Sequence, residues 1–258
     1  MSARVTRISV APVKGLSLHH PEAVELAKDG VPGDRAFFII DENNEMVSAT
    51  RLGPLVSATA EHDAEAGTLA IRFADGTTVA GAIELGEPEA VKFFGLGLEA
   101  RSVQGDYSAA LSELVGKPVR LVETPGKRAG VDRGAYGAAT LISRASLERL
   151  AEQLGEDEVD GRRFRMTFEI DGVEPHAEDG WIDREVRVGG ATVRIGGNVG
   201  RCALTTRNPE TGVVDLKTLH ALGEYRDEVP TSEPLPFGVH ASVVTPGRVA
   251  VGDAVELL

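Results

Sequence analysis

The sequence predicts an α+β protein, mostly β, with two β-barrel-like domains and a few short helices. Three observations lead to this prediction: apolar and polar residues alternate along many short segments, glycines and prolines separate these segments, and few segments have helical spacing. Alternation with a period of two is typical of half-buried antiparallel sheets and small barrels. A chain of 258 residues is long enough for one large domain or two modest ones, each with its own core.

The expected strands follow one another along the chain. Residues 4–13 have the pattern of an opening strand, and residues 36–40 form a β-favouring run that stops at the turn of residues 41–44. Three hairpins are expected, around Asp75-Gly76, Gly189-Gly190 and Pro246-Gly247. In the last hairpin, residues 239–243 would pair with residues 249–251.

Three segments have the spacing of amphipathic helices. The clearest begins after Ser143, which can cap the helix N-terminus, and ends at Gly155. Its apolar residues lie on one face, at positions Leu147, Leu150, Ala151 and Leu154. The other two helices are expected at residues 107–116 and 215–225.

The domain boundary is expected in a glycine-rich region, either at residues 95–105 or at the loop of residues 125–130. We divide the chain into residues 1–104 and residues 105–258. Residues 95–100 also match G-x-G-x-x-A, the pattern of a dinucleotide-binding loop. Such a loop must open a helix, whereas here helical spacing resumes only at Asp106, so an interdomain turn is the favoured interpretation.

The composition restricts the partners and the compartment. A formal net charge of -13 argues against nucleic acid and anionic membranes, which bind basic surfaces. The sequence contains no apolar run of about 18 residues or more and no signal-peptide pattern. Together with the single cysteine, these features predict the cytoplasm as the compartment.

Cys202 is the only cysteine and directly follows Arg201. A lone thiol excludes an internal disulfide and any site that needs several cysteines. Two roles stay open: a metal ligand or nucleophile beside a guanidinium, or a small buried hydrophobic residue. The six histidines lack the spacing of a metal site, and the acidic residues 174–179 are expected in a solvated loop.

Basic residues stand near turns, in segments that also contain glycine. They are Lys14, Arg35, Arg163, Arg165 and Arg201. Guanidinium groups bind phosphate through two parallel hydrogen bonds, and glycine lets backbone amides approach a ligand. If residues 160–165 are extended, Arg163 and Arg165 point to the same side. These residues predict either an anionic, phosphate-bearing ligand, for which pyridoxal phosphate stays open, or surface ion pairs.

Several segments follow one another in a characteristic order. They are residues 11–15 (APVKG), 30–35 (GVPGDR), 48–51 (SATR), 142–147 (ISRASL), 160–165 (DGRRFR), 200–212 (GRCALTTRNPETG), 224–226 (EYR), 236–238 (PFG) and 246–253 (PGRVAVGD). The set resembles the MOSC-domain family, named for the C-terminal domain of molybdenum cofactor sulfurases, with the N-terminal β-barrel domain that often precedes it. Within that family the chain is most similar to the bacterial relatives of the mitochondrial amidoxime-reducing component.

The resemblance implies a pterin-based molybdenum cofactor, molybdopterin with Mo, bound in a cleft. It implies that Cys202 is the catalytic residue and the metal ligand. Cofactor-binding roles fall to Lys14, Arg35, Ser143, Ser146, Arg163, Arg165 and Arg201. The implied activity is reduction of small N-hydroxylated or N-oxide substrates, with electrons from a separate donor protein. A non-redox carrier of the cofactor or of sulfur, and a barrel without cofactor, stay open as alternatives.

Overall fold

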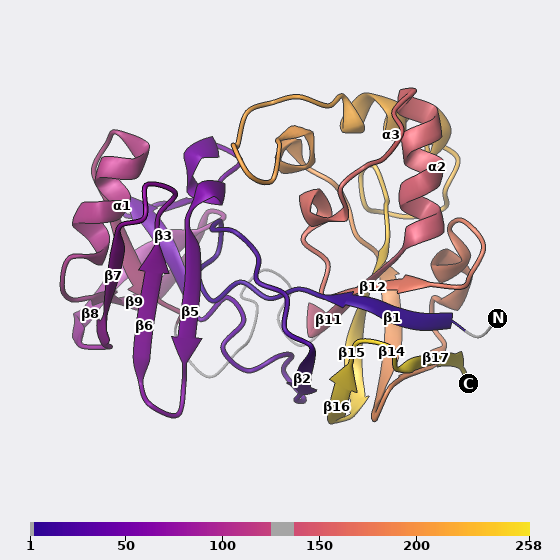
Figure 1. Cartoon of the computed structure of the whole chain (residues 1–258), viewed down its shortest axis with the longest axis horizontal. Coiled ribbons are helices and arrows are strands. Elements are labelled where there is room, and N and C mark those ends of the chain that lie inside the picture. The colour runs from indigo at the N-terminus through magenta and orange to yellow at the C-terminus, as the bar shows by residue number, and fades with distance from the viewer. Residues whose placement is uncertain (1–2, 125–136) are drawn as a thin grey trace.

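A computed structural model describes residues 3–124 and 137–258 (Figure 1). Strands dominate it, and three α-helices are present among the described residues, so the mostly β class is confirmed. The alternative domain boundary at residues 125–130 lies outside the described residues. Within those residues, no helix has the length and apolar character needed to cross a membrane.

A closed barrel of seven strands forms the part of the molecule on the right of Figure 1. In order around the barrel, the strands are β1 (Ala3–Ile8), β12 (Phe168–Asp171), β11 (Ala139–Ser143), β15 (Val239–Thr245), β14 (Ala191–Asn198), β13 (Glu185–Val188) and β17 (Ala254–Leu257). β11 and β12 are parallel, and the other neighbours are antiparallel. Alternating residues of these strands are buried inside the barrel, as the period of two predicts.

The N-terminal half contains two further sheets. One has the order β4 (Met46–Val47), β3 (Phe37–Asp41), β10 (Val119–Glu123), β9 (Leu96–Val103) and β8 (Leu85–Phe93). The other is β5 (Thr59–Asp63), β6 (Thr68–Arg72) and β7 (Thr78–Ala82). Helix α1 (Tyr107–Val115) packs with both around a shared core. The hairpin at Asp75-Gly76 is confirmed as β6–β7.

Strands from opposite ends of the sequence pair with each other. β1 pairs with β17, and β2 (Ala23–Leu26) pairs with β16 (Gly247–Ala250). The predicted hairpin around Pro246-Gly247 is therefore wrong, because β15 pairs with β11 and β14 instead. Val249 is fully buried in the barrel core, with Val24 packed against that core, and this burial favours the long-range pairing. The division of the chain after residue 104 stays a prediction.

The helix predictions agree with the structure at most ends. α2 (Arg144–Leu154) begins at the Ser143 cap and ends at Gly155, whose φ of 70° is the left-handed conformation expected of a C-cap glycine. α1 likewise ends at Gly116. α3 spans only Thr218–Tyr225, and residues 215 and 216, which precede it, donate their backbone N–H groups to the Thr206 carbonyl. The hairpin at Gly189-Gly190 is confirmed, and the opening strand ends early, at Ile8.

Candidate functional site

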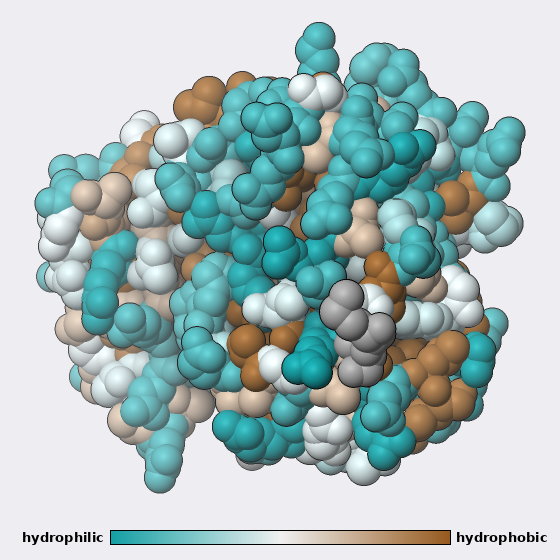
Figure 2. All heavy atoms as spheres, turned by 45° about the vertical axis from the view of Figure 1, so that its right-hand side comes forward, coloured by the Kyte–Doolittle hydropathy of each residue, from teal (hydrophilic) through white to brown (hydrophobic). Residues whose placement is uncertain are grey.

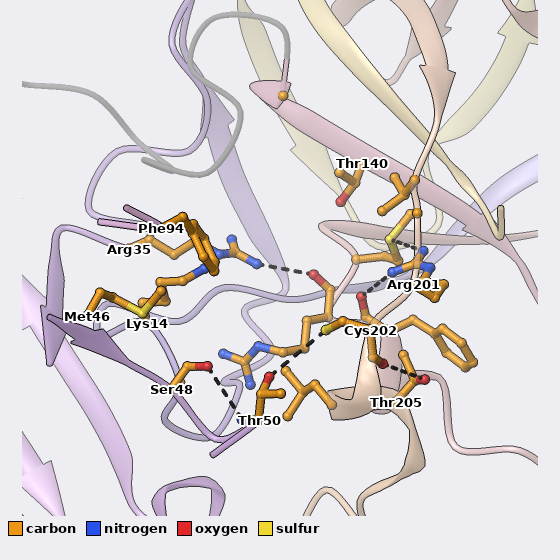
Figure 3. A pocket seen from close by; sticks show the side chains of 18 of the residues that line it. Lys14, Arg35, Met46, Ser48, Thr50, Phe94, Thr140, Arg201, Cys202 and Thr205 are labelled. Carbon is orange, nitrogen blue, oxygen red and sulfur yellow. Dashed lines mark hydrogen bonds between the residues drawn. The ribbon is translucent and has the colours of Figure 1, made fainter. Parts of the chain in front are cut away.

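A pocket of about 510 Å³ lies where the N-terminal half meets the barrel. One side carries Lys14, Arg35 and Phe94, and the other carries Arg201 and Cys202 (Figure 3). The molecular face in Figure 2 is mostly hydrophilic, and its hydrophobic residues form separate groups. The structure thus brings Cys202 and all five predicted basic residues, which are far apart in the sequence, to one pocket.

The thiol of Cys202 is exposed in this pocket. Cys202 follows β14 by four residues and precedes the short 3₁₀ helix η5 (Ala203–Thr206), whose N-cap it is. Its carbonyl oxygen accepts hydrogen bonds from the backbone N–H of Thr205 (3.2 Å) and from the Thr205 hydroxyl (3.1 Å). The Cys202 Sγ lies 4.0 Å from Thr50 Oγ1 of the N-terminal half. The alternative of a buried hydrophobic cysteine is therefore wrong.

Arg201 is buried and holds the backbone around the thiol. Its guanidinium donates to the Phe237 carbonyl through Nε (2.8 Å) and Nη2, and to the Phe164 carbonyl through Nη1 (3.0 Å). The same group lies over the Phe164 ring, 5.2 Å from its centroid. Such a desolvated cation has little freedom to move, so Arg201 fixes the segment that carries Cys202.

Arg163 forms a two-point ion pair with Asp215. Its Nη1 and Nη2 lie 2.6 and 2.9 Å from the two carboxylate oxygens, and this pairing lowers the pKa of Asp215. Asn208 donates a third hydrogen bond to the same carboxylate, at 3.0 Å. Residues 161–164 form the 3₁₀ helix η3, and Arg165 has a left-handed φ of 52°. The expected extended segment that puts Arg163 and Arg165 on one side is therefore wrong, although both residues line the pocket.

Lys14, Arg35 and Arg165 complete the basic lining. Arg35 pairs with Asp34, and its Nη2 donates to the Arg165 carbonyl at 3.2 Å across the two halves. The Lys14 Nζ lies 5.3 Å from the centroid of the Phe94 ring. Arg35, Phe94 and Arg165 all have positive φ values, of 53°, 49° and 52°. Non-glycine residues rarely adopt this conformation, and such strain concentrates at functional sites.

Ser143 and Ser146 do not lie in this pocket. Both are fully buried, and the Ser143 hydroxyl caps α2 by accepting a hydrogen bond from the Ser146 backbone N–H at 3.1 Å. The Glu178 carboxylate accepts hydrogen bonds from the Ser146 hydroxyl (2.8 Å) and the Ser143 backbone N–H (3.2 Å). Glu178 itself is fully buried in the 3₁₀ helix η4 (Ala177–Trp181), and this burial raises its pKa. The predicted solvated loop at residues 174–179 is therefore wrong at this carboxylate.

Comparison with known proteins assigns the family. The pattern of the MOSC domain matches residues 128–256, and that of the MOSC N-terminal beta barrel domain matches residues 2–118. The chain belongs to the MOSC domain family.

The curated relatives of this MOSC protein include amidoxime-reducing components from several mammals. Human mitochondrial amidoxime-reducing component 1 is 29% identical over 98% of the chain and 82% of the relative. Mitochondrial amidoxime reducing component 2 from Rattus norvegicus is 28% identical over 97% of the chain and 82% of the relative. Molybdenum cofactor sulfurase from Danio rerio is 23% identical over 93% of the chain, which spans 32% of that protein.

The tertiary structure adds pocket residues that the sequence reasoning missed. They include Met46, Thr50, Phe94, Thr140, Thr167 and Thr205. Phe94 has a local signal, since it stands with Gly95 between two strands that pair as a hairpin, β8 and β9. Because residues 94 and 95 form the turn of this hairpin and no helix opens after Gly95, the structure gives the dinucleotide pattern no support. Among the described residues, no group of three or more His, Cys, Asp and Glu side chains could hold a metal ion.

Proposed function

We propose that this MOSC protein binds the molybdenum cofactor in the pocket and reduces small N-hydroxylated or N-oxide compounds, with electrons from a separate donor protein. The observation that carries this proposal is the exposed Cys202 thiol on a pocket with seven basic and two acidic lining residues, in a chain of net charge -13. The basic residues are Lys14, Arg35, Arg51, Lys92, Arg163, Arg165 and Arg201. Such a local excess of positive charge favours an anionic ligand.

The residues present fit this cofactor. A thiolate is a soft ligand, and the dithiolene sulfurs of molybdopterin would supply the other soft donors, so one protein cysteine is enough. The pocket volume of about 510 Å³ lies within the range of small-molecule sites. Lys14, Arg35 and Arg165 would bind the phosphate of the cofactor, and Cys202 would hold the metal. Arg163 and Arg201 are buried, whereas the other three are half-buried, and their guanidinium groups bond Asp215 and backbone carbonyls, so we assign them positioning roles.

When bound, the cofactor supplies the two-electron chemistry that breaks an N–O bond. Two electrons from the donor and two protons convert the N-hydroxyl compound to the amine or amidine, and the oxygen leaves as water. The protein orients the substrate over the Cys202 side of the pocket, where Thr50 offers a hydroxyl group. Because Arg201 and η5 fix Cys202, the thiolate needs little rearrangement to hold the metal.

The relatives named amidoxime-reducing component support the reductase, and they match nearly the whole chain. The relative named molybdenum cofactor sulfurase supports a second candidate, a non-redox carrier of the cofactor or of sulfur. In both cases the exposed thiol of Cys202 would hold the cargo or the metal. Only the reductase would turn over an N-hydroxylated substrate.

The experiment begins with protein expressed in a host that synthesises the molybdenum cofactor. We expect bound molybdenum, and reduction of benzamidoxime when an artificial electron donor is added. Cys202→Ser should abolish turnover, whereas Arg72→Ala, which changes an exposed ion pair with Glu61, should keep it. Bound molybdenum without turnover would favour a carrier of the cofactor, and protein without molybdenum would contradict both the reductase and the cofactor carrier.

The donor is tested with the same preparation. We expect no turnover from NADH or NADPH alone, since the chain has too few cysteines for a plant-type ferredoxin cluster and the structure shows no helix opening at the G-x-G-x-x-A segment. Adding a flavin reductase and an iron–sulfur or haem carrier should start the reaction. Substantial turnover from NADH alone would contradict the separate donor.

A further inference from the structure

Phe94 occupies a backbone position that disfavours large side chains. Phe93 pairs with Leu96, so Phe94 and Gly95 are the two central residues of a tight hairpin turn. Both have positive φ, 49° and 82°, as a type I′ turn requires. Asn, Asp and Gly are the residues that normally fill the first central position, and another two-residue turn of this chain, between Val188 and Ala191, uses two glycines.

Burial does not offset the strain at Phe94. The side chain is 67% exposed, and it lies outside the apolar cluster that contains Phe93. The Phe94 ring meets the edge of Phe93 at a centroid distance of 5.0 Å and an interplanar angle of 84°. The Lys14 ammonium lies 5.3 Å from the Phe94 centroid. These contacts orient the ring, but they leave much of it open to the solvent and the pocket.

The open ring belongs to the pocket wall. Phe94 is one of the lining residues, and Figure 3 shows it beside Lys14 and Arg35, across the pocket from Cys202. Strain that persists at an exposed position indicates a functional constraint, because the fold gains nothing from it. An exposed aromatic face with cations beside it suits a flat aromatic ring that carries negative charge or electronegative atoms.

We propose that Phe94 is a stacking platform for a planar aromatic ring bound in the pocket. The inference rests on the proposed function, which offers two sources for such a ring: the pterin of the cofactor, or the aromatic part of the substrate. In either case Phe94 is a positioning residue. It fixes the plane of the ring relative to Cys202 and leaves the metal site itself unchanged.

The test is Phe94→Asn, because asparagine tolerates the left-handed conformation and Asn-Gly is the preferred type I′ pair. The melting temperature of the cofactor-free protein should not fall, since relief of the backbone strain offsets the lost contacts with Phe93 and Lys14. The matched control is Leu96→Thr on the same hairpin, where the leucine is 74% exposed and does not line the pocket. Phe94→Tyr keeps the aromatic ring and should behave like the wild type in every binding measurement.

Two measurements separate the sources. Pterin released by oxidation is quantified by fluorescence, and a content in Phe94→Asn at least about 3-fold below wild type would identify the pterin as the ring. Alternatively, the KM for benzamidoxime should rise about 5-fold or more while that for acetamidoxime stays within about 2-fold, as expected for loss of one stacking contact. That result would identify the substrate.

A third measurement does not depend on turnover. The affinity of molybdenum-loaded protein for benzamidine is measured by calorimetry, and Phe94→Asn should weaken it about 5-fold or more if the substrate stacks. If wild-type protein loads the cofactor but reduces nothing, the proposed reductase fails while the pterin content and the benzamidine affinity still decide the role of Phe94. Equal pterin content, KM values and benzamidine affinity in wild type and Phe94→Asn would overturn the inference, as would wild-type protein that binds neither pterin nor benzamidine.

Discussion

The pair of Arg163 and Asp215 should be a main support of the segment that follows Cys202. Replacing Asp215 by asparagine keeps the shape of the side chain but puts an NH₂ group against one N–H of the guanidinium. It also removes the countercharge from Arg163, whose side chain is only 5% exposed. The substitution isolates the ion pair because little packing volume is lost.

The expected magnitude follows from these contacts. A hydrogen bond to a charged group contributes about 1.5–3 kcal/mol, and an uncompensated buried charge can cost about 3–5 kcal/mol. Because the Asp215 side chain is 34% exposed, water can replace part of the lost interaction. We therefore expect Asp215→Asn to lower the free energy of unfolding by about 2–3 kcal/mol. Urea unfolding followed by circular dichroism measures this value.

The control is the exposed pair of Arg149 and Glu152, for which Glu152→Gln should cost no more than about 0.5 kcal/mol. A double-mutant cycle with Arg163→Met should give a coupling energy of about 1–3 kcal/mol. An Asp215→Asn protein as stable as Glu152→Gln would refute the argument.

Molybdenum content separates positioning from direct binding. If Arg163 acts through Asp215, both single variants should lose molybdenum to a similar extent. If Arg163 binds the cofactor directly, only Arg163→Met should lose it.

Four further outcomes are expected. Cys202→Ser should change the free energy of unfolding by less than about 0.5 kcal/mol, because the side chain is exposed, while molybdenum content falls. Burial lowers the pKa of His176 from 6.5 to about 4, so the unfolded chain takes up this proton first and stability decreases as the pH falls from about 6.5 to about 4. The full shift corresponds to roughly 3 kcal/mol, which partial solvent exposure reduces to about 1–2 kcal/mol, and His176→Gln should flatten the pH profile by that amount. Arg35→Ala should lower pterin content, measured by fluorescence, whereas Arg72→Ala should not, because Arg72 is exposed on β6. Gly212→Ala should lower the free energy of unfolding in urea by more than about 2 kcal/mol, since φ is 72° and the new methyl group would clash with the backbone of the N-terminal half.

The sequence alone determined the local elements that depend on neighbouring residues. Alternating residues predicted the hairpins at Asp75-Gly76 and Gly189-Gly190, and the structure has both. The cap at Ser143 and the terminal Gly155 located α2 to the residue. These features follow from short-range hydrogen bonds and backbone preferences, which a stretch of a few residues encodes. The order of motifs also identified the family before any pocket was visible.

Only the tertiary structure decided which distant segments meet. β16 pairs with β2 rather than with β15, because both strands bury apolar residues against the same barrel core. The sequence around Glu178 predicts a solvated loop, yet the Glu178 side chain is buried beside the N-terminus of α2.

The same distinction applies to the pocket. Arg163 and Arg201 could be recognised as basic residues near glycine-containing turns, but their partners, Asp215 and two backbone carbonyls, depend on the folded chain. Phe94 lies far from Cys202 in the sequence and lines the same pocket. Residue types and their order specify the available chemistry, whereas burial and long-range pairing determine which groups are tied to the protein and which stay open to a ligand.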